Sequence, residues 1–410
     1  MTPQETGSSR RFTNRTLLLA AAGLWIAAAA LAALFLLTGG EAGAEKSVTT
    51  TTSAPATTST TLPPTTSTSV TSTTTTVPAT TTTTLPPSLT IAAGGDVMGD
   101  RGVAAFIRAH GAPAVLAKVK PFLADAQLAF VNLECPISDK GTAQASKEYT
   151  FRAPISLPGG LVSAGIDVVS MANNHVLDYG RAAFLDTLKR LDAAGVAHAG
   201  AGANSASAAA PALLITPSGT VAVLAFTEII PGGFEAGPKQ PGTNPAIPDY
   251  KKMLSSIKAA AARADFVVVS MHWGIEYTAQ ANAGQRALAH QIIDAGADLV
   301  IGHHPHVIQG IELYRNKLIA YSLGDFVFDH NGRATGEAFV LRASLPQTGL
   351  PSLEIVPVYL NDLTGVPAPV TGEDADAILG RLTKLSASLG LKLVQEGDRA
   401  KLAGDPVVTP

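Results

Sequence analysis

Short apolar runs alternate with stretches of helical periodicity from residue 89 onward. The clearest apolar runs cover 89–96, 126–134, 166–175, 265–274 and 298–306. Helical patterns lie between them, for example at 181–194 and 284–295. Buried strands that alternate with helices are typical of an α/β fold with largely parallel strands.

Other apolar runs break this alternation. Residues 212–226 and 308–326 each read as a β-hairpin, because a turn sequence separates two apolar halves. The runs 336–345 and 353–360 are also strand-like, and 373–390 begins with acidic residues that suit the start of a helix. We therefore expect mixed sheets rather than one doubly wound parallel sheet.

The N-terminal part has a different hydropathy pattern. Residues 17–37 carry no charge, and at about 1.5 Å per residue such a helix crosses the ~30 Å hydrocarbon core of a membrane. Arg10, Arg11 and Arg15 precede it, so the positive-inside rule keeps residues 1–16 in the cytoplasm and exports the rest. We expect a single-pass membrane anchor that carries an extracytoplasmic globular domain.

Other interpretations of the N-terminal part stay open. Ala42, Gly43 and Ala44 resemble a signal-peptide cleavage site, although a signal peptide has a shorter apolar region of about 7–15 residues. Residues 8–15, SSRRFTNR, faintly resemble a twin-arginine export signal, but the strong apolar run argues against it. The Thr-, Pro- and Ser-rich residues 47–88 carry no charge and cannot bury a core, so we interpret them as a stalk or a plain linker.

Charge and cysteine content exclude some classes of protein. The formal net charge is −3 over 410 residues, with no basic block of the kind that binds nucleic acid. Cys135 is the single cysteine, which excludes an internal disulfide and a cysteine-type zinc site. We interpret Cys135 as a small buried residue rather than a reactive thiol.

Polar side chains that can bind metal stand at the ends of the apolar runs. They are Asp96, Glu134, Asn173, Asn174, His175, His272, His303, His304 and His306. Any one of them has an ordinary explanation as a helix cap, a turn or a core histidine. Because sites form at the carboxyl ends of strands in α/β sheets, the whole set indicates a metal centre. Carboxylate, amide and imidazole ligands suit Zn, Mn or Fe, and a bridging carboxylate would allow one ion or two.

A series of motifs between about residues 89 and 328 resembles one known family. The motifs are GGDVMGDR, NLECPIS, YTFRAP, MANNHVLDYG, HWGIEY, GHHPHVIQG and YSLGDFVF. They resemble the CapA family of capsule synthesis proteins, which is linked to poly-γ-glutamate capsules and belongs to the wider calcineurin-like metallophosphoesterase fold. The resemblance implies an α/β fold in which two mixed β-sheets pack as a sandwich flanked by helices. We place this domain at 89–362 and a C-terminal extension with one helix at 363–410.

The resemblance also implies roles for individual residues. It implies these metal ligands: Asp96, Glu134, Asn174, His272, His304 and His306. His175 would act as a proton donor near the substrate. Independently of the resemblance, the position of Asp178 three residues after His175 would let it orient the imidazole, or it would instead cap the helix near Gly180.

The sequence departs from the family pattern at two positions. The wider fold begins with Asp-x-His, but Met98 stands in the place of the histidine, so one metal position lacks a ligand. Asp100 is a candidate replacement, and a centre with a single ion is the alternative. Asp325 stands where related sequences usually have asparagine.

Three charged residues are candidates for binding substrate. Arg101 and Arg152 suit an anionic group, because a guanidinium fork matches carboxylate or phosphate. Either arginine could instead form a structural ion pair. We expect Glu276 to line the cleft.

The expected function is that of a membrane-anchored metal-dependent hydrolase in the synthesis, release or attachment of an anionic surface polymer such as poly-γ-glutamate. Expected partners are this polymer, the membrane and subunits of a polymer-synthesis complex, and not nucleic acid. Two other functions stay open, because fold alone does not determine substrate. One is a phosphoesterase that acts on a cell-wall or lipid phosphate, and the other is a non-catalytic accessory of a polymer export complex.

The anchor is open to a direct test. If residues 17–37 hold the chain in the membrane, protease added outside intact cells should release a soluble domain by cutting within 47–88. Immunoblotting of the supernatant would detect the released domain. A domain that resists protease in intact cells and is cut only after lysis would contradict this orientation.

Overall fold

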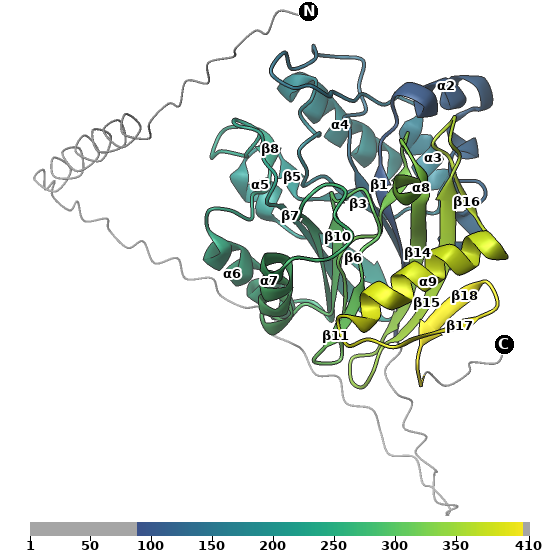
Figure 1. The fold of residues 1–410 in the computed structure, drawn as a ribbon. Coiled ribbons are helices and arrows are strands. Elements are labelled where there is room, and N and C mark those ends of the chain that lie inside the picture. Colours follow the sequence, from purple (N-terminus) through teal and green to yellow (C-terminus); the bar gives the residue numbers. More distant parts are fainter. Residues whose placement is uncertain (1–87, 405–410) are drawn as a thin grey trace, which may run out of the picture. The chain divides into compact units, whose positions relative to one another are not determined.

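The structure, a computed structural model, describes residues 88–404. In this part of the chain two β-sheets pack face to face (Figure 1). The larger sheet has the order β17-β18-β15-β14-β1-β2-β3-β4, with β13 beside β1 and β16 beside β15. Its strands are β1 (Leu89–Val97), β2 (Leu128–Leu133), β3 (Val168–Ser170), β4 (Ala197–Ala199), β13 (Asp325–Val327), β14 (Glu337–Leu345), β15 (Ser352–Leu360), β16 (Pro367–Pro369), β17 (Leu393–Glu396) and β18 (Arg399–Leu402). The pairs among β1 to β4 are parallel, whereas β14 joins β1 and β15 in antiparallel fashion.

The second sheet has the order β11-β12-β10-β9-β7-β6. Its strands are β6 (Ala212–Thr216), β7 (Gly219–Thr227), β9 (Phe266–His272), β10 (Leu299–His303), β11 (Ile311–Tyr314) and β12 (Lys317–Ala320). Its central pairs are parallel and its outer pairs are antiparallel. A small third sheet pairs β5 (Ala201–Gly202) with β8 (Gly242–Thr243). Both large sheets are thus mixed, as predicted.

The core between the sheets is built from alternate residues of the buried strands. Phe130 of β2, Phe266 of β9 and Phe339 of β14 are buried in it. The neighbours of Phe130, Ala129 and Val131, belong to a second core on the outer face of the same sheet. Because both faces of these strands are covered, they read in the sequence as continuous apolar runs.

Helices cover the outer faces of both sheets. α2 (Arg101–His110), α3 (Leu157–Ala164) and α4 (Gly180–Ala194) pack on the larger sheet. α6 (Tyr250–Ala261) and α7 (Ala283–Asp294) pack on the second sheet (Figure 1). The shorter helices α5 (Ser205–Ala209) and α8 (Arg333–Gly336) lie in connections. The predicted mixed α/β fold, with two packed sheets and flanking helices, is therefore confirmed for the described residues.

The C-terminal residues belong to the same sheet system. α9 (Glu373–Ala387) packs on β11, β15 and β17, and it buries Ile378 and Leu382 in the core between the sheets (Figure 1). β18 pairs with β15 and so extends the larger sheet. The sequence predicted one helix in 363–410 but not these strands. β17 and β18 are short and carry polar residues, so their hydrophobic pattern is weak.

One predicted hairpin is confirmed and the other is partly wrong. Residues 212–226 form the antiparallel pair β6 and β7. Within 308–326, β11 and β12 pair across a turn at Arg315 and Asn316, which have φ values of +50° and +62°. The chain then leaves this sheet, and β13 pairs in parallel with β1 of the larger sheet. Hydrophobic pattern alone does not tell which of two sheets an apolar run joins.

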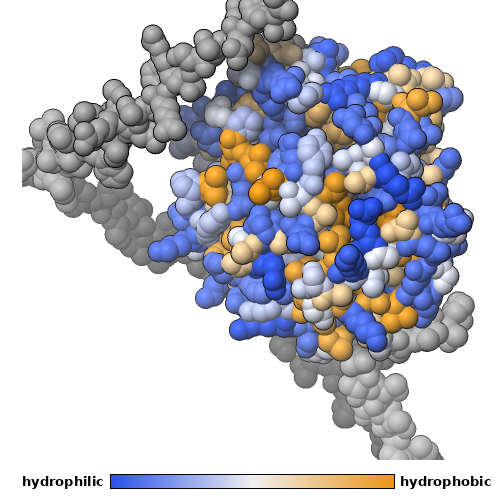
Figure 2. Space-filling model, viewed as in Figure 1, coloured by the Kyte–Doolittle hydropathy of each residue, from blue (hydrophilic) through white to orange (hydrophobic). Residues whose placement is uncertain are grey.

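On the face drawn in Figure 2, hydrophobic residues lie scattered among hydrophilic ones. No helix within residues 88–404 is both long enough and apolar enough to cross a membrane. The predicted anchor at 17–37 and the predicted stalk up to residue 87 lie outside the described residues, so both stay predictions.

Close packing requires glycine at position 302, one residue before His303. A Cβ at Gly302 would lie 1.9 Å from the carbonyl oxygen of Tyr321 and 2.6 Å from Nε1 of Trp273. A Cβ at Gly159 of α3, by contrast, would have nothing within 4 Å. The two glycines therefore form a matched pair for testing how tightly the end of β10 is packed.

We expect Gly302→Ala to lower the free energy of unfolding by about 1–3 kcal/mol or more, because an added methyl group in a close-packed core forces the backbone apart. Gly159→Ala makes the same change in an open helical position and should be neutral or stabilise by up to about 1 kcal/mol. Urea denaturation of both variants measures the difference. Equal midpoints for the two variants would contradict the close approach at Gly302.

Candidate metal centre

The polar residues at the strand ends converge at one edge of the sandwich. In the larger sheet Asp96 of β1 is paired in register with Asn132 of β2. In the second sheet His272 of β9 is paired with His303 of β10. Parallel strands bring residues at their carboxyl ends together, as the sequence analysis assumed. The two groups meet across the sheets, because His303 lies against Asp96.

Asn132, which the sequence analysis did not single out, holds two carboxylates in place. Its Nδ2 donates to Oδ1 of Asp96 at 2.9 Å and to Oε2 of Glu134 at 3.2 Å. Its Oδ1 accepts from Nδ2 of Asn173 at 3.1 Å, and Oδ1 of Asn173 accepts from the backbone N–H of His175 at 3.0 Å. This chain of amides links the carboxylates to the His175 loop. The spacing of two residues between Asn132, in β2, and Glu134, directly after it, is the signal that could have revealed it.

Imidazoles face these carboxylates from the second sheet. Nε2 of His272 lies 2.9 Å from Oδ1 of Asn174 and 3.8 Å from Oε1 of Glu134. Nδ1 of His303 lies 2.9 Å from Oδ1 of Asp96, but without the direction of a hydrogen bond. The structure thus brings together side chains that are far apart in the sequence.

The segment His304-Pro305-His306 enters the site with a strained backbone. The φ angles are +96° at His304 and +57° at His306, a region that residues other than glycine rarely adopt. The backbone N–H of His304 donates to Oδ2 of Asp96 at 3.2 Å. Nδ1 of His306 lies 2.8 Å from Oδ1 of Asp325 and 4.0 Å from Oδ2 of Asp96. Such strain often marks a functional site, where it aims side chains that an ordinary turn would not.

Asp325 is the third buried carboxylate of the centre. The parallel pairing of β13 with β1 sets it beside Asp96. Among the described residues, three groups of side chains bring ligand atoms within 4.8 Å of one another. They are Asp96, Glu134 and His272; Asp96, His306 and Asp325; and Glu276, His304 and His306.

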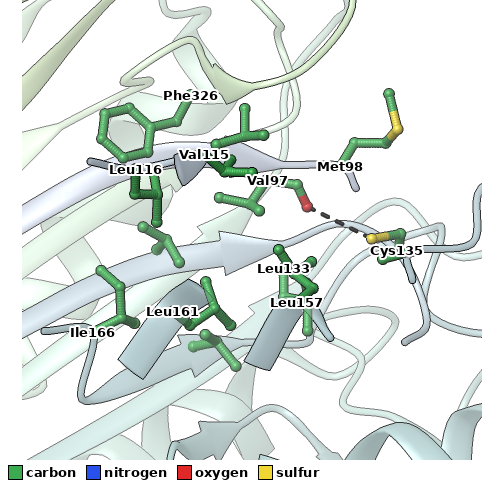
Figure 3. Close-up of a cluster of buried hydrophobic side chains, with 14 of the residues drawn as sticks. Val97, Met98, Val115, Leu116, Leu133, Cys135, Leu157, Leu161, Ile166 and Phe326 are labelled. Atoms are coloured by element: carbon green, nitrogen blue, oxygen red, sulfur yellow. Dashed lines mark hydrogen bonds between the residues drawn. The ribbon is translucent and has the colours of Figure 1, made fainter. Parts of the chain in front are cut away.

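Met98, which stands where the family pattern has histidine, packs in a hydrophobic cluster (Figure 3). Its Sδ accepts from the backbone N–H of Asp100 at 3.0 Å. The expectation that Asp100 replaces the missing ligand is wrong, because its carboxylate is used elsewhere. Oδ1 accepts from the N–H of Arg101 at 2.7 Å at the start of α2, and Oδ2 accepts from the N–H of Arg152 at 2.9 Å. Asp325 is the carboxylate that the structure adds instead.

Cys135 belongs to the same hydrophobic cluster (Figure 3). It is fully buried, and its sulfur accepts from the backbone N–H of Gly99 at 3.3 Å. Burial raises the pKa of the Cys135 thiol to about 12, so the thiolate does not form near neutral pH. The prediction of a small buried residue is confirmed.

Burial dominates the electrostatics of the centre. It raises the pKa of Glu134 well above its usual value, and the charge of Asp96 adds to this shift. It lowers the pKa of His272 well below its usual value, with a further contribution from His304. At His306 burial opposes the charged form, but the carboxylates of Asp325, Glu134 and Asp96 together outweigh it and raise the pKa to about 10. The protein alone therefore balances these buried charges incompletely.

Several buried ligand atoms have no hydrogen-bond partner among the described residues. They are Oε1 of Glu134, Nδ1 of His272, Nε2 of His303 and Nδ1 of His304. Unpartnered buried polar atoms are rare and cost about 1–3 kcal/mol each. A divalent transition ion would bind carboxylate and neutral imidazole lone pairs and offset the carboxylate charge. The residues present therefore fit a metal ion, without identifying which one.

His175 is paired with Asp178 beside the centre. Nδ1 of His175 lies 2.7 Å from Oδ2 of Asp178, which also accepts from the N–H of Phe151 at 2.8 Å. Because an ionised carboxylate only accepts, Nδ1 carries the proton and Nε2 is left for other partners. Lys147, which the sequence analysis did not single out, donates to Oδ1 of Asp178 and to the carbonyl oxygen of Asn174 at 2.7 Å. It lies in a polar segment without periodicity, so no sequence signal marked it.

A cleft of about 160 Å³ opens at this centre. Residues that line it include Arg101, Tyr149, His175, Glu276, Tyr277, His306 and Asp325. The guanidinium of Arg101 forms an ion pair with Asp329 at 3.0 Å. Arg152 is not among the residues that line the cleft. Its guanidinium instead packs against the ring of Tyr179, 4.2 Å from the ring centre. Of the three predicted substrate-binding residues, the structure brings Arg101 and Glu276 to the cleft.

Comparison with known proteins identifies the family. The family model described as bacterial capsule synthesis protein PGA_cap matches residues 90–330. The capsule biosynthesis protein CapA of Bacillus anthracis is 35% identical over 72% of this chain and 73% of its own length. The PGA biosynthesis protein CapA of Bacillus subtilis (strain 168) is 34% identical over 71% and 76%. A probable polyglutamine synthesis accessory protein of Mycobacterium tuberculosis (strain H37Rv) is 32% identical over 65% and 74%. The predicted resemblance is confirmed, and the chain belongs to the bacterial capsule synthesis protein family PGA_cap.

Proposed function

We propose that this protein is a metal-dependent hydrolase that acts on an anionic polymer during capsule or poly-γ-glutamate synthesis. One observation carries the proposal: buried carboxylates and imidazoles, several with unpartnered ligand atoms, lie together beside an open cleft. The two Bacillus relatives, whose names refer to capsule and PGA biosynthesis, support the biological setting.

The proposed metal ligands are the six that the family resemblance implies, together with Asp325. Asp96, Glu134, Asn174, His272, His304 and His306 would hold one ion or two of Zn, Mn or Fe. Asp325 would add a ligand on the side where Met98 offers none. When bound, such an ion supplies Lewis-acid activation of water and of the bond to be cleaved.

His175 would move the proton. Asp178 holds the Nδ1–H of the ring, so Nε2 is the nitrogen that exchanges a proton in the cleft. Burial lowers the pKa of His175, which favours a neutral ring at rest. Such a ring can take a proton from the attacking water at Nε2 and pass it to the leaving group. Lys147 would hold both Asp178 and the Asn174 backbone in position.

The setting that we propose for this chemistry is the outer surface of the cell membrane. It is supported by the apolar residues 17–37, the arginines before them and the uncharged segment 47–88. Arg101 and Glu276 would contact the substrate from the cleft wall. The polymer, the membrane and subunits of a polymer-synthesis complex are the proposed partners.

A non-catalytic accessory role is the second candidate. The name of the Mycobacterium relative, an accessory protein, favours it. A phosphoesterase that acts on a cell-wall or lipid phosphate rests on the resemblance to the wider fold alone. Assays of metal-loaded protein on γ-glutamyl amides and on phosphodiesters separate these candidates, because an accessory protein should turn over neither.

The first test of the centre is metal content. We expect His304→Ala to bind less transition metal per chain than the wild type, because it removes a ligand that must be neutral to bind. Elemental analysis of full-length protein measures the ratio. His198→Ala, which removes an imidazole that pairs with Asp192 instead, is the control and should keep wild-type content. Unchanged metal content in His304→Ala would show that His304 is not a ligand.

The second test separates the roles of Asn174 and His175. We expect His175→Ala to reduce turnover by roughly 10²–10⁴-fold with little change in metal content, because a positioned acid or base contributes about that factor. Asn174→Ala should lose metal together with activity. Metal per chain and hydrolysis are measured side by side for both variants. Equal metal loss in the two variants would refute this division of roles.

A further inference from the structure

A second hollow lies next to the His175–Asp178 pair, and we name it the Lys147 cavity. Its volume is about 370 Å³. Residues that line it include Gln144, Ser146, Lys147, Leu177, Arg181 and Phe234. None of the described residues that line it is acidic, and two of them are cationic. The proposed hydrolysis makes no use of this space.

One segment, residues 144–151, forms the wall between the Lys147 cavity and the metal-binding cleft. Gln144 and Lys147 line the cavity, whereas Tyr149 lines the cleft. Nζ of Lys147 lies 3.0 Å from Nδ1 of His175, which itself lines the cleft. The two hollows therefore lie on either side of side chains that contact each other, Lys147 and His175.

Arg181 presents a fixed guanidinium to the cavity. Its Nη2 donates to the carbonyl oxygen of Gly233 at 2.7 Å, and its Nε donates to that of Pro241 at 3.2 Å. Within residues 88–404 it has no carboxylate partner, and its Nη1 has no hydrogen-bond acceptor. It also lies in the first turn of α4, where a positive charge opposes the helix dipole. The two hydrogen bonds to carbonyl oxygens fix the guanidinium, but its charge has no carboxylate partner among the described residues.

The two hollows differ in charge. The cleft is lined by the carboxylates of Glu276, Asp325 and Asp329, and its Arg101 is already paired with Asp329. Among the described residues, the Lys147 cavity has two lining cations and no lining carboxylate; Lys147 is paired with Asp178, which does not line the cavity, and Arg181 has no carboxylate partner. Of the two, the cavity is therefore the better place for a carboxylate group of a ligand.

We propose that the Lys147 cavity is a second binding site for a carboxylate of a polyanionic chain, whose neighbouring segment occupies the metal-binding cleft. The free Nη1 and the remaining N–H of Nη2 of Arg181 offer the paired donors that a carboxylate matches. Lys147, which is paired with Asp178, is the second cation that lines the cavity. The identity of the chain rests on the proposed function, but binding at this site does not depend on whether the chain is cleaved.

The test measures binding of γ-linked glutamate dimer and hexamer to full-length protein by calorimetry, under conditions in which chromatography shows the oligomers intact. We expect the hexamer to bind the wild type more tightly than the dimer does. Arg181→Gln should weaken hexamer binding roughly tenfold, as for the loss of one charge-assisted contact. Arg181→Lys keeps the charge but loses the two-pronged guanidinium, so its affinity for the hexamer should lie between those of the wild type and Arg181→Gln.

Arg108→Gln is the matched control. It also removes an arginine, but Arg108 is an exposed residue of α2 and lines neither hollow. It should bind the hexamer as the wild type does, and unchanged metal content and unfolding midpoints would verify that all variants fold. The proposal would be overturned if Arg181→Gln bound the hexamer with wild-type affinity, or if Arg108→Gln lost as much affinity as Arg181→Gln. It would also be overturned if the wild type did not bind the hexamer. Binding that depends on Arg181, combined with no turnover of the hexamer by metal-loaded protein in a separate activity assay, would refute the proposed activity and leave this site standing.

Discussion

Three carboxylates buried in one small space are the constraint on which the rest of the structure depends. Asp96, Glu134 and Asp325 are each almost fully shielded from water. A buried carboxylate is costly unless a cation or hydrogen bonds offset its charge. The protein supplies amide donors from Asn132 and imidazoles from the second sheet, yet Oε1 of Glu134 has no hydrogen-bond partner within residues 88–404. A metal ion is the simplest group that would complete this arrangement.

The surrounding fold holds these charges in place with strained backbone and close packing around the site. Two histidines adopt positive φ angles to reach the site, and so do Arg101 and Tyr277 on the cleft wall. Gly302 lets the end of β10 approach the backbone of Tyr321 more closely than any side chain would permit. Such strain and close packing persist only where the two sheets press on the site from both sides. The rigid sandwich is therefore a condition for the geometry of the centre.

Lys147 connects the centre with its surroundings. It contacts the Asn174 carbonyl, the Asp178 carboxylate and the His175 ring, and it also lines the second cavity. A proposed metal ligand, a proposed proton carrier and a cationic hollow thus meet at one ammonium group. This arrangement would suit the proposed binding of a charged chain, with neighbouring segments in the cleft and in the cavity.

The sequence by itself determined the alternation of strands and helices and the residue types at the strand ends, because hydrophobic periodicity and side-chain chemistry are local properties. Asp96 and His272 could be predicted for this reason. Only the tertiary structure decided that β13 leaves its hairpin to bring Asp325 beside Asp96, that Asp100 caps α2 instead of facing the centre, and that Lys147 reaches Asp178. These outcomes depend on which sheet a strand joins and on distances between residues far apart in the chain. No local pattern encodes them, because they arise from the packing of the two sheets and their loops against each other.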